Sequence, residues 1–228
     1  MTSLTTFRLS LDQFWAIVVK DWRAELRARQ VWVSMGFFAL LALVVFNFAF
    51  DLRVENKASV GPGALWVAFL FASVLGLGRT VGAELDSGTM DRLLLCPVDR
   101  QVIYLAKLLG NLVFILIVQI VAIPIFAVIY DLPVLTPSII PIVALGTLGI
   151  AAVGALFAAV SAQTRAREVL APLLTFPLVI PVVIAAVKAT EALVQPVAND
   201  APWLGLLAAF AIIYVSVGAL TFQYVVED

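Results

Sequence analysis

One stretch of the chain mixes carboxylates with aliphatic residues: ELDSGTMDRLLLCPVDRQ, at positions 84–101. Its apolar positions recur every three or four residues, which predicts a short helix with one apolar side. Thr89 would cap this helix after a turn at Gly88, and the charged side would face water. The apolar positions are Met90, Leu93, Leu94 and Pro97, and the charged ones are Glu84, Asp86, Asp91 and Arg92. Such a helix suits the docking of a soluble partner, and a solvated loop is the alternative interpretation.

The rest of the chain offers little that could do chemistry. It contains no histidine, which excludes histidine acid–base catalysis, Ser-His triads and histidine ligands to zinc or haem. The single cysteine, Cys96, allows no internal disulfide, and no GxxxxGK[ST] motif is present to bind a nucleotide. The apolar runs hold no carboxylates of the kind that drive proton pumps. We therefore expect no enzyme activity and no metal, cofactor or nucleic acid bound by this chain. A transporter of this sequence would take its energy from another subunit.

The composition identifies the elements that must position these residues. The chain of 228 residues is 63% hydrophobic and 13% charged, whereas a soluble domain is about 45–50% apolar and about 25% charged. Six runs approach or exceed the roughly 20 apolar residues that a helix needs to cross a membrane. They predict an all-α integral membrane protein whose residues 1–228 form one transmembrane domain. The spans are expected at about 31–50, 60–80, 106–130, 138–160, 169–188 and 203–226.

The basic residues predict the orientation of the spans. Of the 14 lysines and arginines, eleven precede the first span, or lie between spans two and three or between spans four and five. The other three, Arg53, Lys57 and Lys188, lie on the opposite side. The positive-inside rule therefore predicts that both termini are cytoplasmic.

The N-terminal segment 1–30 has a pattern of its own. Apolar residues recur in it at helical spacing while charged residues occupy another face. We expect an amphipathic helix in the cytoplasmic headgroup layer, with Trp15 and Trp22 at the polar boundary. A basic anchor that only sets the topology is the alternative.

Two features within the spans suggest movement or close packing. Pro172, Pro177 and Pro181 fall within the fifth span, and we expect that helix to be kinked or locally unwound, either as a hinge or as a static packing solution. In the fourth span, small residues share one face and permit close helix approach. They include Gly146, Gly154 and Ala158.

The segment GALWVAFLFASVLGLGRTVGAELDSGTMDRLLLCPVDRQVIYLAKLLGN, positions 63–111, resembles the CcmB family, the permease subunits of the haem-exporting ABC transporter of cytochrome c maturation. Length, six spans and the proline-bearing fifth span extend the resemblance over nearly the whole chain. The core G-T-x-x-x-L-L-x-x-P is less specific, because ABC-2 type exporters share it. Three residues depart from the family pattern: Gly82 and Ala83, where charge is usual, and Cys96, where a small or aliphatic residue is usual.

The resemblance implies an ABC-2 type permease in which segment 84–97 is the coupling helix that rests in a groove of the ATPase subunit. The coupling residues would be Glu84, Asp86, Gly88, Thr89, Met90, Asp91, Leu93, Leu94 and Pro97. It further implies two copies paired with two CcmA-like ATP-binding subunits in the bacterial inner membrane. CcmC-like and CcmD-like subunits would join them, and the complex would release a haem-loaded, CcmE-like chaperone on the periplasmic side. ATP would be bound by the partner, and haem would be cargo of the complex.

Two other functions fit the same residues. The chain could be an ABC-2 permease for another cargo, such as a lipid-linked glycan or a drug. It could also be a non-transporting scaffold that transmits ATPase motion to its neighbours, which the scarcity of polar residues in the spans favours.

Overall fold

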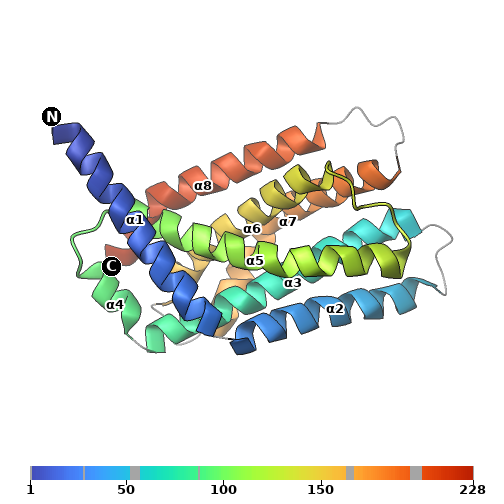
Figure 1. Cartoon of the computed structure of the whole chain (residues 1–228), viewed down its shortest axis with the longest axis horizontal. Helices are drawn as coiled ribbons and strands as arrows, with labels where there is room; N and C mark the ends of the chain where they lie inside the picture. Colours follow the sequence, from blue (N-terminus) through green and yellow to red (C-terminus); the bar gives the residue numbers. More distant parts are fainter. Residues whose placement is uncertain are drawn as a thin grey trace.

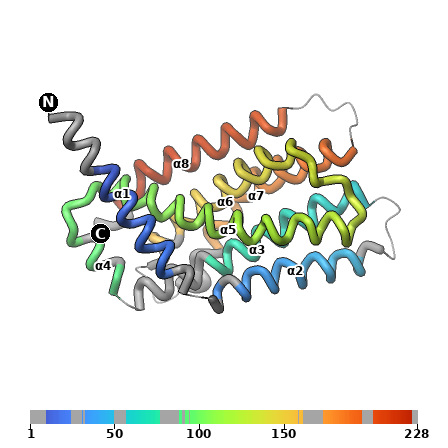
Figure 2. The backbone as a smooth tube through the Cα atoms, in the orientation of Figure 1, coloured from blue at the N-terminus to red at the C-terminus, as the bar shows by residue number. Residues whose placement is uncertain are grey.

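The structure is a computed structural model of the whole chain, and every element in its described residues is helical. The described residues are 2–27, 29–51, 57–86, 88–162, 167–195 and 202–227 (Figure 2). They form α1 (Thr2–Arg27), α2 (Arg29–Asp51), α3 (Lys57–Asp86), α4 (Thr89–Leu94), α5 (Arg100–Tyr130), α6 (Ile139–Ala162), α7 (Arg167–Val194) and α8 (Trp203–Glu227).

The long helices α2, α3, α5, α6, α7 and α8 form one elongated bundle (Figure 1). The short helix α4 lies at one end, together with the last turn of α8, and α1 crosses the outside of the bundle obliquely at this same end. We call it the α4 end. At the opposite end, the far end, α2, α5 and α7 finish and α3, α6 and α8 begin.

Among the residues that the structure describes, five helices are long and apolar enough to cross a membrane. Their apolar segments are Lys57–Gly76, Arg100–Tyr130, Ile139–Phe157, Leu173–Val194 and Trp203–Tyr224. In α2 the described part of the apolar segment is Val33–Ala49. The all-helical architecture is as expected, and the chain is a multi-pass membrane protein.

Several helices extend beyond the expected spans, for local reasons. Helix α5 begins at Arg100 because Asp99 precedes it as N-cap, its side-chain oxygen accepting the Gln101 N–H at 2.9 Å. Helix α7 continues to Val194, and the Lys188–Glu191 ion pair, 2.7 Å long, spans one turn of it. Glu191 therefore lies in a helix, beyond position 188, where the fifth span was expected to end.

The fifth span is not unwound at its prolines. Helix α7 runs without a break from Arg167 to Val194, so the expectation of local unwinding is wrong, whereas a kink or hinge stays a prediction. Each proline removes a single N–H from the helix ladder, and the intervening hydrogen bonds can still close. Between two of the prolines, the carbonyl of Leu178 also accepts the Tyr214 hydroxyl of α8 at 2.7 Å.

The interior consists of two apolar clusters. The first surrounds Trp66, whose indole Nε1 donates to Thr190 Oγ1 at 3.0 Å and whose ring lies against Gly146. The second lies toward the α4 end and includes Ile17 of α1 and Tyr104 of α5. Trp66 of α3 thus contacts both α6 and α7.

Candidate functional site at the α4 end

The turn before α4 depends on a glycine. Gly88 has a φ of 63°, and nothing lies within 4 Å of the position that a Cβ would occupy, so the turn conformation and not a close contact requires glycine. The Arg92 N–H donates to the Gly88 carbonyl at 3.3 Å. Gly88 therefore holds the N-cap position that the sequence assigned to Thr89, and Thr89 is the first helical residue.

Helix α4 is shorter than the predicted helix 84–97. Glu84 and Asp86 belong to the last turn of α3, which ends at Asp86. At the other end the helix stops at Leu94, because the Cys96 N–H turns back to the Leu93 carbonyl at 3.2 Å. Pro97 therefore lies outside the helix and does not share its apolar side.

The surface of this segment differs from the predicted pattern. Leu93 packs against the second apolar cluster. Leu95, which is not on the predicted apolar side, is 86% exposed, and Cys96 and Pro97 beside it are exposed too. We call Leu95–Pro97 the exposed turn. Helical spacing could not find it, because it follows the helix. The structure does not describe five of the predicted side chains: Glu84, Asp86, Met90, Asp91 and Leu94.

Helix α1 braces this region from one side. Its inner face packs on the second apolar cluster through Ile17, with Phe14 and Val18 beside it. The apolar face predicted to lie in lipid thus partly contacts protein. A charged residue, Asp21, lies on the same inner face and is only 9% exposed. Amphipathic spacing alone cannot identify such a residue, because its partner comes from another helix.

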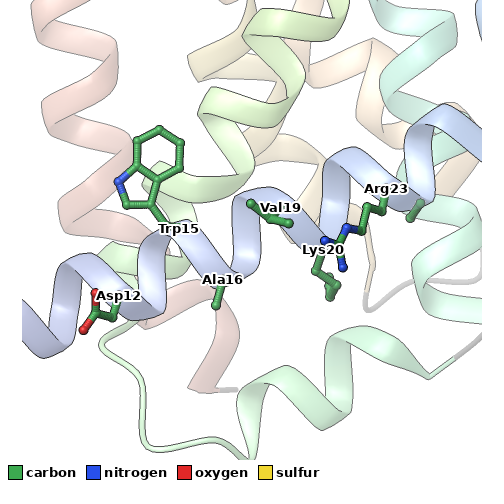
Figure 3. Close-up of a pocket in the computed structure, with 7 residues that line it drawn as sticks. Asp12, Trp15, Ala16, Val19, Lys20 and Arg23 are labelled. Atoms are coloured by element: carbon green, nitrogen blue, oxygen red, sulfur yellow. The ribbon is translucent and has the colours of Figure 1, made fainter.

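The outer face of α1 carries an open groove of about 680 Å³ (Figure 3). Trp15 is 56% exposed there, and Lys20 and Arg23 lie about one and a half and two turns further along the helix. The full lining is Asp12, Trp15, Ala16, Val19, Lys20, Arg23 and Ala24. An aromatic ring followed by basic side chains is the combination that favours the membrane headgroup layer.

The other predicted site residues lie elsewhere. Gly146, Pro177 and Pro181 belong to the membrane-crossing parts of α6 and α7 and are not brought together with α4. Gly146 receives the Trp66 ring, and Gly154 is buried in α6. The structure does not describe the side chains of Pro172 and Ala158.

Within the membrane region, one groove lies between α2 and α5. It has a volume of about 190 Å³ and an apolar lining: Gly36, Leu40, Ile117, Val118, Val121 and Ala122. Gln119 and Thr147 form a buried hydrogen bond of 2.8 Å between α5 and α6. Among the described residues, no group of three or more carboxylate or cysteine side chains could hold a metal ion.

Comparison with known proteins finds the same family over most of the chain. The family model described as CcmB protein matches residues 12–227. Heme exporter protein B of Pseudomonas aeruginosa is 30% identical over 179 residues, covering 77% of this chain and 80% of that protein. The protein of the same name from Bradyrhizobium diazoefficiens is 27% identical over 205 residues, covering 89% and 92% of the two chains. That from Rhodobacter capsulatus is 26% identical over 197 residues, covering 85% and 88%. The chain is a member of the CcmB family.

Proposed function

We propose that this chain is the membrane subunit of an ABC transporter complex that acts in cytochrome c maturation. It couples ATP hydrolysis by a separate subunit to haem export, or to release of a haem-loaded chaperone on the outer side. Family membership and the names of the relatives support this function. The chain itself contributes contacts and movement, and the ATP-binding partner contributes the catalytic residues.

The observation that carries the proposal is the exposed turn after α4. Leu95 projects into solvent at 86% exposure, on a segment held by the Gly88 turn and by the packing of Leu93. A large apolar side chain held out at the end of a membrane bundle suits insertion into a groove of a soluble partner. The partner proposed for this groove is a CcmA-like ATP-binding subunit.

The proposed topology has six spans in the bacterial inner membrane, with both termini and α4 in the cytoplasm. Helix α2 is the first span: its 23 residues extend about 34 Å at 1.5 Å per residue, enough for a hydrocarbon core of about 30 Å. Helix α1 lies in the headgroup layer with Trp15 and Arg23 outward. The proposed assembly contains a second copy of this chain, CcmC-like and CcmD-like subunits, and a CcmE-like chaperone.

One observation favours the scaffold alternative. The groove between α2 and α5 measures about 190 Å³, below the roughly 300–1,000 Å³ of ordinary ligand sites. This groove alone is therefore too small to hold a cargo, and a chain that only transmits ATPase motion would need none. Co-purification with a tryptophan-rich, CcmC-like haem protein distinguishes cytochrome c maturation from an ABC-2 permease for another cargo.

The test uses a pair of exposed leucines. Leu95→Asp should leave the fold and membrane insertion unchanged, since that side chain is 86% exposed. It should weaken co-purification of the ATP-binding subunit at least tenfold, because burying a leucine in a partner contributes about 1.5–3 kcal/mol. Leu135→Asp, at a position 62% exposed at the far end, is the matched control and should have no effect.

A second variant tests the turn itself. Gly88→Val places a β-branched residue at a φ of 63° and should also reduce association. Arg167→Ala, at the start of α7, should do much less. Full association with both the Leu95 and the Gly88 variants would refute coupling through α4.

A further inference from the structure

Two polar contacts join α1 to separate parts of the α4 end. Gln13 Nε2 donates to the Pro97 carbonyl of the exposed turn at 3.3 Å. Two turns further along α1, Asp21 Oδ2 lies 3.0 Å from Lys107 Nζ of α5. Eight residues of helix separate these contacts along α1, or about 12 Å. The same short stretch of α1 therefore contacts both the candidate coupling segment and a membrane-crossing helix.

We propose that α1 is a strut that carries displacement of the exposed turn into α5, and that Asp21 is the positioning residue that fixes α1 on α5. This inference rests on the proposed function, since it assigns a route for the motion that enters at α4.

The Asp21 carboxylate is held by both of its oxygens. Oδ1 pairs with Lys20 at 2.9 Å and Oδ2 pairs with Lys107 at 3.0 Å. The Asp21 and Lys107 side chains are only 11% and 14% exposed, so water screens their interaction weakly. Lys20 is 41% exposed and contributes less. The Lys107 pair is therefore the contact that fixes α1.

The ion pair between Asp21 and Lys107 fixes the position of α1 along α5, which the apolar contacts beside it do not. Apolar packing between α1 and α5, through Phe14, Ile17 and Val18, is non-directional and tolerates a small slide of one helix along the other. A slide that separates Asp21 from Lys107 breaks the contact between two largely buried charges, which costs more than a shift of apolar contacts. The pair therefore fixes the register of α1 on α5, so that α1 moves with α5 as one body.

The direct chain connection from α4 to α5 is a second route that acts in parallel with α1, because Val98 packs against the second apolar cluster and Asp99 caps α5. Residues 95–99 are not helical, and Leu95, Cys96, Pro97 and Asp99 are exposed. The Gln13 contact holds the turn at Pro97, ahead of the first residue of α5.

The first test removes the charge of Asp21 in the assembled complex. A bacterial strain lacking its own family member receives the wild-type chain, Asp21→Asn or Asp21→Glu. We expect Asp21→Asn to retain wild-type membrane abundance, co-purification of the ATP-binding subunit and ATP hydrolysis, but to lower the yield of haem-stained c-type cytochrome at least fivefold. Asp21→Glu keeps the charge and should restore most of the yield. Asp21→Lys combined with Lys107→Asp should restore more than either change alone.

The second test cross-links the contact between Gln13 and Pro97. In a Cys96→Ser background, Gln13→Cys and Pro97→Cys are joined by mild oxidation, and the cross-link is scored on gels. If α1 and the exposed turn move together, the cross-linked protein keeps its cytochrome yield. Loss of yield on cross-linking, reversed by reduction, would overturn the strut.

The outcomes separate this inference from the function on which it rests. A wild-type chain that neither co-purifies with an ATP-binding subunit nor restores cytochromes refutes the proposed function, and the strut with it. A wild-type chain that does both, with an Asp21→Asn variant of equal yield, refutes the strut alone. Reduced membrane abundance of Asp21→Asn would show that the pair serves folding only, and would also refute it.

Discussion

The contact between Trp66 and Gly146 gives a sharp test of packing in the bundle. A Cβ placed on Gly146 would lie 2.7 Å from Trp66 Cζ3 and closer still to Cη2, whereas carbon atoms in contact are normally about 3.5–4.0 Å apart. The indole cannot easily move away. It is fully buried, and its Nε1 is fixed by the 3.0 Å hydrogen bond to Thr190. Gly146→Ala should therefore be destabilising, although alanine is the better helix former.

The size of the effect follows from two opposing terms. Replacing glycine by alanine within a helix stabilises by about 0.5–1 kcal/mol, and overpacking a filled core costs about 1–3 kcal/mol. Gly110→Ala in α5 is the matched control, because nothing lies within 4 Å of a Cβ there. Only the helix term acts on Gly110, so the two variants should differ by about 1–3 kcal/mol, the full overpacking cost.

The assay is thermal unfolding in detergent, followed by the remaining monodisperse protein on size exclusion. For a chain of this size, 1 kcal/mol corresponds to about 2–4 °C in Tm, so Gly146→Ala should unfold at least about 2 °C below Gly110→Ala. Trp66→Phe removes the ring atoms that clash, and in that background Gly146→Ala should cost less. Equal Tm values for the two alanine variants would refute the reasoning.

Two further predictions concern the ends of the bundle. Leu95 and Leu135 are both exposed, but at opposite ends of the bundle. In a Cys96→Ser background, Leu135→Cys should react with an impermeant thiol reagent added to intact spheroplasts, whereas Leu95→Cys should react only after permeabilisation. The reverse pattern would show that the topology is inverted. Tyr130→Phe should lower stability by about 1 kcal/mol through loss of the buried 3.0 Å hydrogen bond to the Leu43 carbonyl. It should leave the haem absorbance of the isolated complex unchanged, and a lost haem band would show that this tyrosine is a ligand.

The sequence predicts the helices well and their ends less well. Long apolar runs strongly favour a membrane-spanning helix. The bounds of α6 and α8 therefore lie within two residues of the predicted spans. The ends depend on single residues outside the runs. Asp99 starts α5 early by capping it, and the Gly88 turn lets α3 keep its polar last turn. Neither effect changes the hydropathy from which the spans were predicted.

The candidate site could be located but not described from the sequence. The sequence predicts a turn at Gly88, and the structure confirms it with a positive φ at this glycine. Leu95 was not singled out, because helical spacing assigns no role to a residue beyond the end of the helix. Asp21 was not singled out either, since a carboxylate among basic residues reads as a solvated charge until Lys107 is brought beside it. Pairings between distant segments carry no local signal.

The docking of α1 has a consequence for biosynthesis. Its hydrogen bond to the Pro97 carbonyl joins residues 84 positions apart, and its ion pair reaches deeper still, to Lys107. Helix α1 therefore cannot make these two contacts until the chain has been made through the start of α5. Until then Asp21 stays hydrated and Ile17 has no protein neighbour in α5. Helix α1 thus reaches its final place only after α2, α3 and the start of α5 have been made.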